Sequence, residues 1–115
     1  MADLQEKNFD TPDEQHKPGR GTVDVVKLGG ITVRRLTLQP GWRWSEDVKP
    51  TAKTDTCQIP HLNVHISGRL GVKMADGTEK EYGPGDVSLL PPGHDAWVVG
   101  TEPLVIIEQT PPDLN

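Results

Sequence analysis

The sequence has one cysteine and no long apolar run, and each scarcity excludes a class of protein. Cys57 is the only cysteine among 115 residues, so the chain has no internal disulfide, which fits a reducing compartment. No apolar stretch approaches the ~20 residues that a membrane-spanning helix needs. The opening residues, MADLQEK, lack the apolar core of a secretory signal. We therefore expect a cytoplasmic protein without a membrane partner.

Blocks of like charge are also missing. The formal net charge of −5 comes from acidic and basic residues that are interspersed along the chain. Proteins that bind nucleic acid or an anionic membrane usually carry a basic patch or stripe, and no such footprint is present. We therefore expect no nucleic acid among the partners.

Glycine and proline, by contrast, are abundant. The chain has 12 Gly and 11 Pro, and their even spread is typical of turns between short strands. Asp76-Gly77 predicts a tight β-hairpin. Further on, the pattern predicts a turn at Gly83-Pro84-Gly85 and a strand over 87–90 that is enclosed on both faces. Pro91-Pro92-Gly93 ends that strand, because proline cannot donate to a ladder. No segment keeps a helical period, so we predict an all-β sandwich or barrel.

Composition divides the chain into three parts. Residues 1–22 form a polar arm that proline and glycine interrupt, and we expect it to be flexible or donated to a neighbouring subunit. Residues 23–110 carry the alternating apolar pattern of the barrel, and residues 111–115 form a C-terminal tail. The residues expected in the core include Leu36, Leu38, Leu70, Val72, Leu89, Val98 and Ile106.

The turn motifs resemble those of the small single-domain cupins. Gly68-Arg69-Leu70 follows a histidine-bearing strand, and Gly83-Pro84-Gly85-Asp86 and Pro91-Pro92-Gly93-His94 come after it. The resemblance covers about residues 37–108 and implies a jelly-roll β-barrel of about eight to ten short strands. Small cupins commonly pair, so it also implies a homodimer in which the N-terminal arm covers an edge of the partner subunit.

The resemblance further implies a site inside the barrel, although the residues at its positions depart from the family pattern. Counted back from Gly68, the position of the family's glutamate holds His61. The positions of its first two histidines hold Asp55 and Cys57, and Ala96 stands where the last metal-binding histidine is expected. The chemistry of the site therefore depends on the residues that are present.

A bend in the chain would bring several of these side chains together. Along a straight strand Cys57 and His61 lie ~13 Å apart, too far to share one ion. Pro60 weakens the strand, so the preceding segment has room to bend inward. The candidate metal ligands are then Asp55, Cys57, His61 and His94, with His65 as the alternative to His94. Thiolate, imidazole and carboxylate together suit Zn²⁺ or Fe²⁺ better than Mg²⁺ or Ca²⁺. The competing interpretation is a metal-free core in which Cys57 is a small buried hydrophobe and the histidines are hydrogen-bonded.

The aromatic residues indicate a pocket beside this site. Only 4% of the chain is aromatic, and three of those residues are tryptophans. Trp44 and Trp97 are predicted to form an apolar wall above a floor of His61, Asn63 and His65. The alternative is that the tryptophans simply fill a small core.

Two functions stay open on these residues. The first is an isomerase, lyase or dioxygenase that acts on a small organic substrate, with His61 as metal ligand or general base. The second is a non-catalytic module that senses a small molecule. Fold cannot separate the two.

Overall fold

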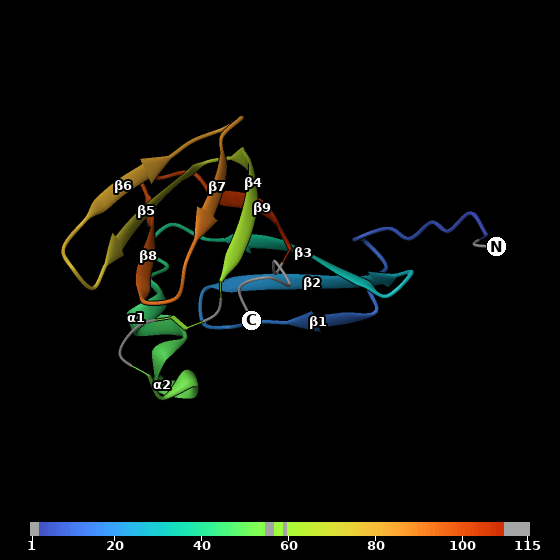
Figure 1. The fold of residues 1–115 in the computed structure, drawn as a ribbon, viewed down its shortest axis with the longest axis horizontal. Coiled ribbons are helices and arrows are strands. Elements are labelled where there is room, and N and C mark those ends of the chain that lie inside the picture. The colour runs from blue at the N-terminus through green and yellow to red at the C-terminus, as the bar shows by residue number, and fades with distance from the viewer. Residues whose placement is uncertain (1–2, 55–56, 59, 110–115) are drawn as a thin grey trace.

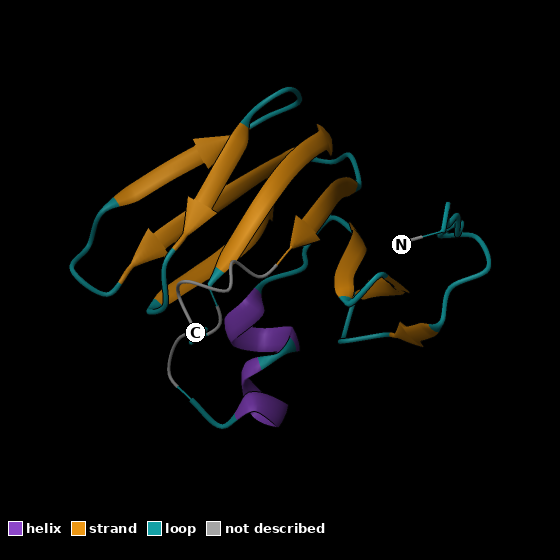
Figure 2. Ribbon diagram, turned by 45° about the vertical axis from the view of Figure 1, so that its right-hand side comes forward, coloured by secondary structure: helices purple, strands orange, loops and turns teal. Residues whose placement is uncertain are grey.

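The computed structural model describes residues 3–54, 57–58 and 60–109, and within these ranges the chain forms nine strands and two short helices (Figure 1). The strands are β1 Glu14–His16, β2 Gly21–Leu28, β3 Ile31–Leu38, β4 His61–Ser67, β5 Arg69–Met74, β6 Glu79–Tyr82, β7 Val87–Leu90, β8 His94–Val99 and β9 Leu104–Gln109. The helices are α1 Trp44–Asp47 and α2 Lys49–Ala52. Strands dominate the molecule, and the helices lie at one end of it (Figure 2).

The strands form two antiparallel sheets around one core. The larger sheet has the order β1-β2-β3-β9-β4-β7, and the smaller sheet has the order β6-β5-β8. Leu38, Leu90 and Ile106 of the larger sheet belong to the same buried cluster as Leu70 and Val98 of the smaller sheet. The all-β prediction is therefore confirmed.

The predicted hairpin joins β5 and β6. Gly77 has a φ of +93°, in the left-handed region that favours glycine, and its amide donates to the Met74 carbonyl at 3.0 Å. The amide of Thr78 donates to Oδ1 of Asp76 at 2.9 Å. The local turn chemistry is thus sufficient to fix this connection.

The core holds most of the residues predicted for it. The buried members are Leu38, Leu70, Val72, Val98 and Ile106. Leu36 is partly buried against the same cluster. Leu89 is 54% exposed, so its assignment to the core is wrong.

The error at Leu89 belongs to the whole of β7, which is enclosed on one face only. Ser88 and Leu90 point into the barrel, whereas Val87 and Leu89 face outward. β7 lies at the end of the larger sheet, and within the described ranges it pairs with β4 alone. An apolar strand is buried on both faces only where another layer of the protein covers each face. Among the described residues nothing covers the outer face of β7, so its outer side chains are exposed.

Five exposed apolar side chains follow one another across this outer face, and we call them the outer stripe. They are Leu62, Val64 and Ile66 on β4 and Val87 and Leu89 on β7. In the β4–β7 register Leu62 lies opposite Leu89, and Val64 lies opposite Val87. The outer stripe is therefore continuous across the two strands.

The segment before the barrel adds one strand to the larger sheet. β1 lies within residues 1–22 and pairs with β2. Asp24 of β2 accepts hydrogen bonds from Gln15 at 2.9 Å and from Arg35 at 3.0 Å. Ahead of β1 the chain extends away from the barrel (Figure 1). The division of the chain at residue 22 stays a prediction, and the tail 111–115 lies outside the described residues.

The two helices have one turn each, and their stabilising contacts come partly from residues distant in the sequence. Asp47 accepts a hydrogen bond from the Arg43 amide at 2.8 Å, and Asp95 accepts one from the Ser45 amide at 3.1 Å. Pro50 lies in the first turn of α2, where its missing N–H costs nothing. No helix among the described residues is long and apolar enough to cross a membrane.

Candidate metal centre

A bend before β4 positions the first two residues of the site. β4 begins at His61, directly after Pro60, and Cys57 lies outside the strand. The backbone of Cys57 instead bridges to His94, the first residue of β8. The Cys57 amide donates to the His94 carbonyl at 2.7 Å, and the Gly93 amide donates to the Cys57 carbonyl at 2.7 Å. The inward bend that the sequence allowed is therefore present.

The bend brings one thiol and two imidazoles together. Sγ of Cys57 lies 3.4 Å from Nε2 of His61. The ligand atoms of Cys57, His61 and His94 all lie within 4.8 Å of one another, and the two rings meet edge to face at 5.1 Å. Cys57 and His94 are buried, and the His61 side chain is 16% exposed. Three of the four predicted ligands thus converge, and Asp55 lies outside the described residues.

Each imidazole has an acceptor at its outer nitrogen. Nδ1 of His94 donates to the Pro91 carbonyl at 2.7 Å, so in the neutral ring Nε2 is the nitrogen with the lone pair. Nδ1 of His61 lies 3.1 Å from Oε2 of Glu108, an ion-pair contact without hydrogen-bond alignment. An imidazole that is held in this way at one nitrogen presents the other nitrogen to a metal.

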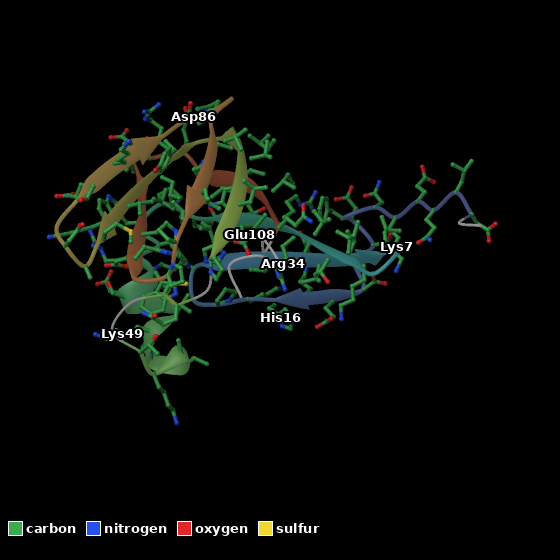
Figure 3. The ribbon with its side chains drawn as sticks, in the orientation of Figure 1. Lys7, His16, Arg34, Lys49, Asp86 and Glu108 are labelled. Atoms are coloured by element: carbon green, nitrogen blue, oxygen red, sulfur yellow. The ribbon has the colours of Figure 1, made fainter. Side chains whose placement is uncertain are left out.

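Glu108 is a site residue that the sequence analysis missed. It lies on β9, opposite Asn63 of β4 on one side and Arg34 of β3 on the other. Arg34 and Glu108 are labelled together near the centre of the larger sheet in Figure 3. The only signal in the sequence is its place two and four residues after the buried Ile106 and Leu104, which puts it on the inward face of β9.

The surroundings of His61 change its proton affinity. Burial by itself lowers the pKa of His61, but the hydrogen bond with Cys57 and the contact with Glu108 favour the charged ring and raise the pKa to about 9. In the metal-free protein His61 is therefore protonated at neutral pH, and a metal that binds Nε2 must displace that proton.

The three side chains line a cavity of about 250 Å³ inside the barrel. Asn63, Glu108 and Arg34 are also in its wall. Apolar side chains from both sheets and from the helical segment line the rest, among them Leu36, Leu70, Trp42, Trp44, Ala96 and Ile106. The cavity wall is therefore mainly apolar, with a small set of polar side chains.

Two of the four residues predicted for the pocket line this cavity. These are Trp44 and Asn63. His65 is 1% exposed, lies deeper in β4, and has its Nε2 2.8 Å from Oγ of Ser88. Trp97 lies beneath the guanidinium of Arg43, 4.7 Å from the ring centre. The residues that line the cavity in the described part of the chain include neither His65 nor Trp97.

Comparison with known proteins supports the fold. The chain matches no protein-family model and no curated protein sequence. Among solved structures, a protein of unknown function from Rhizobium leguminosarum bv. viciae superposes with a TM-score of 0.69 at 22% identity, over 96% of this chain and 99% of that chain. A DUF1255 protein from Acinetobacter sp. ADP1 gives a TM-score of 0.62 at 16% identity, over 86% and 90% of the two chains.

A third similar structure is the oxalate decarboxylase of Bacillus subtilis, a protein with Mn(II) centres. It gives a TM-score of 0.55 at 24% identity, over 85% of this chain and 27% of that chain. Likeness at this level of identity shows the fold alone. The predicted jelly-roll barrel is therefore confirmed as an architecture, and the function has to be argued from the site.

Proposed function

We propose that this protein is a cupin-like barrel that binds a transition metal and a small organic molecule in its cavity. One observation carries the proposal, namely that Cys57, His61 and His94 direct ligand atoms toward one point within 4.8 Å of one another. The acceptors at the outer nitrogens of both imidazoles support the same interpretation, because metal-binding histidines usually have such a partner.

The donor set indicates which metal fits. One sulfur and two nitrogens suit Zn²⁺ or Fe²⁺, whereas Mg²⁺ and Ca²⁺ prefer oxygen. Three protein ligands also leave a coordination position for a substrate or water, as in catalytic zinc sites. Asp55 stays a candidate for a fourth ligand. A metal at this point would supply Lewis acidity to a molecule in the apolar body of the cavity.

The residues around the metal ligands have separate roles. Glu108 holds the ring of His61 in the orientation that turns Nε2 toward Cys57. In an enzyme, His61 would be the group in contact with the reacting centre, as metal ligand or as base. A ligand-sensing module would use the same cavity without turnover.

A different function is favoured by the alignment of Cys57, His61 and Glu108. A thiol, an imidazole 3.4 Å away and a carboxylate 3.1 Å from the other ring nitrogen have the order of nucleophile, base and orienting group. In that function the thiolate of Cys57, paired with the protonated His61, would add to a carbonyl carbon of the ligand. The carbon–oxygen π bond would break, and His61 would give its proton to the carbonyl oxygen. A metal bound to Cys57 excludes it.

Metal analysis separates these functions. Protein purified without a chelator or a histidine tag, and then reconstituted with Zn²⁺ or Fe²⁺, is expected to hold about one metal per chain. His61→Ala and Cys57→Ser should each lower the metal affinity by more than about 100-fold, because each removes a direct ligand. The control is His16→Ala, since His16 lies on exposed β1. The thermal midpoint of each metal-free variant shows whether the barrel is intact.

The opposite result is equally clear. If the parent binds no metal on reconstitution, or if His61→Ala binds as much as the parent, the metal proposal is wrong. In that case, the nucleophile function would be supported if Cys57 is alkylated more slowly in His61→Ala than in the parent.

A further inference from the structure

A short connection between β1 and β2 forms part of the cavity wall. We call residues 17–20, which join His16 of β1 to Gly21 of β2, the strap. The strap turns beside α1 (Figure 1), and Pro18 within it lines the cavity. The carbonyl of Pro18 accepts a hydrogen bond from the indole Nε1 of Trp42 at 3.3 Å, and Trp42 lines the same cavity. The strap therefore lies over the space that a ligand would occupy.

The lining residues that keep some exposure mark the place where the cavity meets solvent. They are Pro18, Val23, Arg34, Leu36, Val48 and His61, whereas the other lining residues in the described part of the chain are buried. Val23 and Leu36 lie opposite each other in the β2–β3 register, and Val48 follows α1 directly. The mouth of the cavity therefore lies among the β2–β3 pair, the strap and the helical segment.

One ion pair fastens the strap to the helical segment, and we call it the clasp. Asp47 of α1 accepts hydrogen bonds from Nε and Nη2 of Arg20 at 3.1 and 3.0 Å, and from the Arg20 amide at 3.3 Å. Gly19 packs on the same carboxylate so closely that a β-carbon at this position would lie 2.4 Å from Oδ1 of Asp47. The Asp47 side chain is 9% exposed and the Arg20 side chain is 50% exposed. The clasp is thus well aligned but only half enclosed.

The strap itself buries little surface. Lys17, Gly19 and Arg20 are exposed. The Arg20 carbonyl accepts a hydrogen bond from the Gln39 amide at 2.9 Å, which ties down the end of the strap where β2 begins. Segments with few buried contacts open locally while the rest of the fold stays intact, and a half-exposed ion pair opposes such opening only weakly. The strap can therefore lift without loss of the sheets.

We propose that the strap is the gate of the cavity and that the clasp sets how often the gate opens. This inference rests on the proposed function, because it assigns the route by which a small molecule reaches Cys57, His61 and His94. Movement of Pro18 away from Trp42 widens the mouth, while the cavity walls that come from the two sheets stay in place.

The single cysteine makes the gate measurable. Cys57 lines the cavity, so its rate of alkylation by iodoacetamide in the metal-free full chain reports access to the cavity. Arg20→Gln removes the clasp and should raise this rate about two- to five-fold, as the loss of one such ion pair allows. Arg20→Lys keeps the charge without the two-pronged geometry and should give a smaller increase.

The matched control is a second half-exposed arginine. Arg69 is 51% exposed, pairs with Glu81 on the smaller sheet, and is not among the described residues that line the cavity. Arg69→Gln should therefore leave the alkylation rate of Cys57 at the value of the parent.

Two further measurements separate local opening from global unfolding. The indole N–H of Trp42 is bonded to the strap, so its hydrogen exchange should become faster in Arg20→Gln by the same factor as the alkylation. In the parent, the alkylation rate should depend only weakly on urea below the unfolding transition, because lifting the strap exposes little surface.

Three results would overturn the inference: the same alkylation rate in Arg20→Gln as in the parent, an equal increase in Arg69→Gln, or a urea dependence in the parent as steep as that of global unfolding. None of these measurements needs a bound metal. A parent that takes up zinc on reconstitution but whose alkylation does not respond to the clasp contradicts this inference alone. A parent that takes up no metal but shows clasp-dependent alkylation contradicts the metal proposal alone.

Discussion

At the scale of single residues, the candidate site includes the carboxylate of Glu108, which is distant in the sequence from each candidate ligand. Glu108 comes from β9, the strand next to the one that carries His61. Its Oε2 lies 3.1 Å from Nδ1 of His61, while Nε2 of the same ring faces Cys57. In the proposed metal site we therefore expect Glu108 to position the ring of His61, an effect that is separable from direct ligation.

Glu108→Gln tests this role. The side chain keeps its shape but loses the charge, so metal affinity should fall by about 10–100-fold, the usual loss for a group behind a ligand. The measurement is a zinc competition titration, with the metal-free thermal midpoint as the check on folding. Glu79→Gln, an exposed substitution on β6, is the control and should change neither quantity. Unchanged zinc affinity in Glu108→Gln would show that Glu108 does not orient His61.

The sequence identified the candidate ligands better than it identified this partner. Cys57, His61 and His94 have side chains that can bind a metal, and Pro60 indicated where the chain bends. A glutamate in a strand usually faces solvent, and its burial becomes visible only once β9 is known to pair with β4. Residue type thus identifies candidate ligands, whereas sheet register identifies the residues that pack behind them.

At the scale of elements, the first three strands are joined by a buried carboxylate. Asp24 of β2 is 4% exposed and accepts hydrogen bonds from Gln15 of β1 and Arg35 of β3. These hydrogen bonds hold the pKa of Asp24 below its usual 3.8, against the opposing effect of burial, and the bond from Gln15 has the largest effect. One charged group therefore stabilises both junctions.

This arrangement predicts how the stability depends on acid. Because the pKa of Asp24 is lower in the folded chain than in the unfolded chain, its contribution is fully present above about pH 4 and is lost as the pH falls through the lowered value. Asp24→Asn should lower the free energy of unfolding at pH 7 by about 1–3 kcal/mol and should flatten this part of the pH profile. Urea unfolding between pH 2 and pH 7 measures both.

The control for Asp24 is a second aspartate on the same arginine. Asp10 contacts Arg35 at 3.2 Å, but its side chain is 81% exposed. Asp10→Asn should change the free energy of unfolding by less than about 1 kcal/mol. If both variants have the same small effect, the buried position of Asp24 adds nothing to the junction.

Elements with local signals were predicted, and those that depend on distant contacts were not. The Asp76-Gly77 hairpin formed as expected because its turn chemistry is contained in two residues. α1 and α2 were not predicted, since α1 depends on Asp95, which lies far along the chain. The prediction that β7 is buried on both faces was wrong, because composition does not show which faces of a sheet are covered by another layer.

At the scale of the whole molecule, the outer stripe predicts a homodimer. Its five apolar side chains are between 36% and 64% exposed and are continuous across β4 and β7. Together they cover on the order of a few hundred Å², the range in which exposed patches mark interaction sites. The outer stripe contains no charged residue, so two copies can meet face to face about a two-fold axis without like charges in contact.

Light scattering tests the dimer. At micromolar concentration the parent should have twice the chain mass of 12.6 kDa. Val64→Lys with Leu89→Lys should give a monomer, because two buried charges would face each other across the axis. Ile31→Lys is the control, since Ile31 is 52% exposed outside the outer stripe. A monomeric parent would contradict the prediction, and a dimer lost only on removal of residues 1–13 would assign the contact to the arm.

The backbone bridge between Cys57 and His94 has a consequence for how this site can vary. Main-chain hydrogen bonds hold the two positions together, and they do not depend on which side chain each position carries. A sulfur at position 57 can therefore be exchanged for an imidazole, or an imidazole at position 94 for a carboxylate, while the spacing of the α-carbons stays the same. Softer and harder donor atoms select different ions, so such exchanges would change which divalent metal the barrel prefers while its architecture stays the same. In the proposed metal site, the preference among metals would thus depend on a few interchangeable side chains.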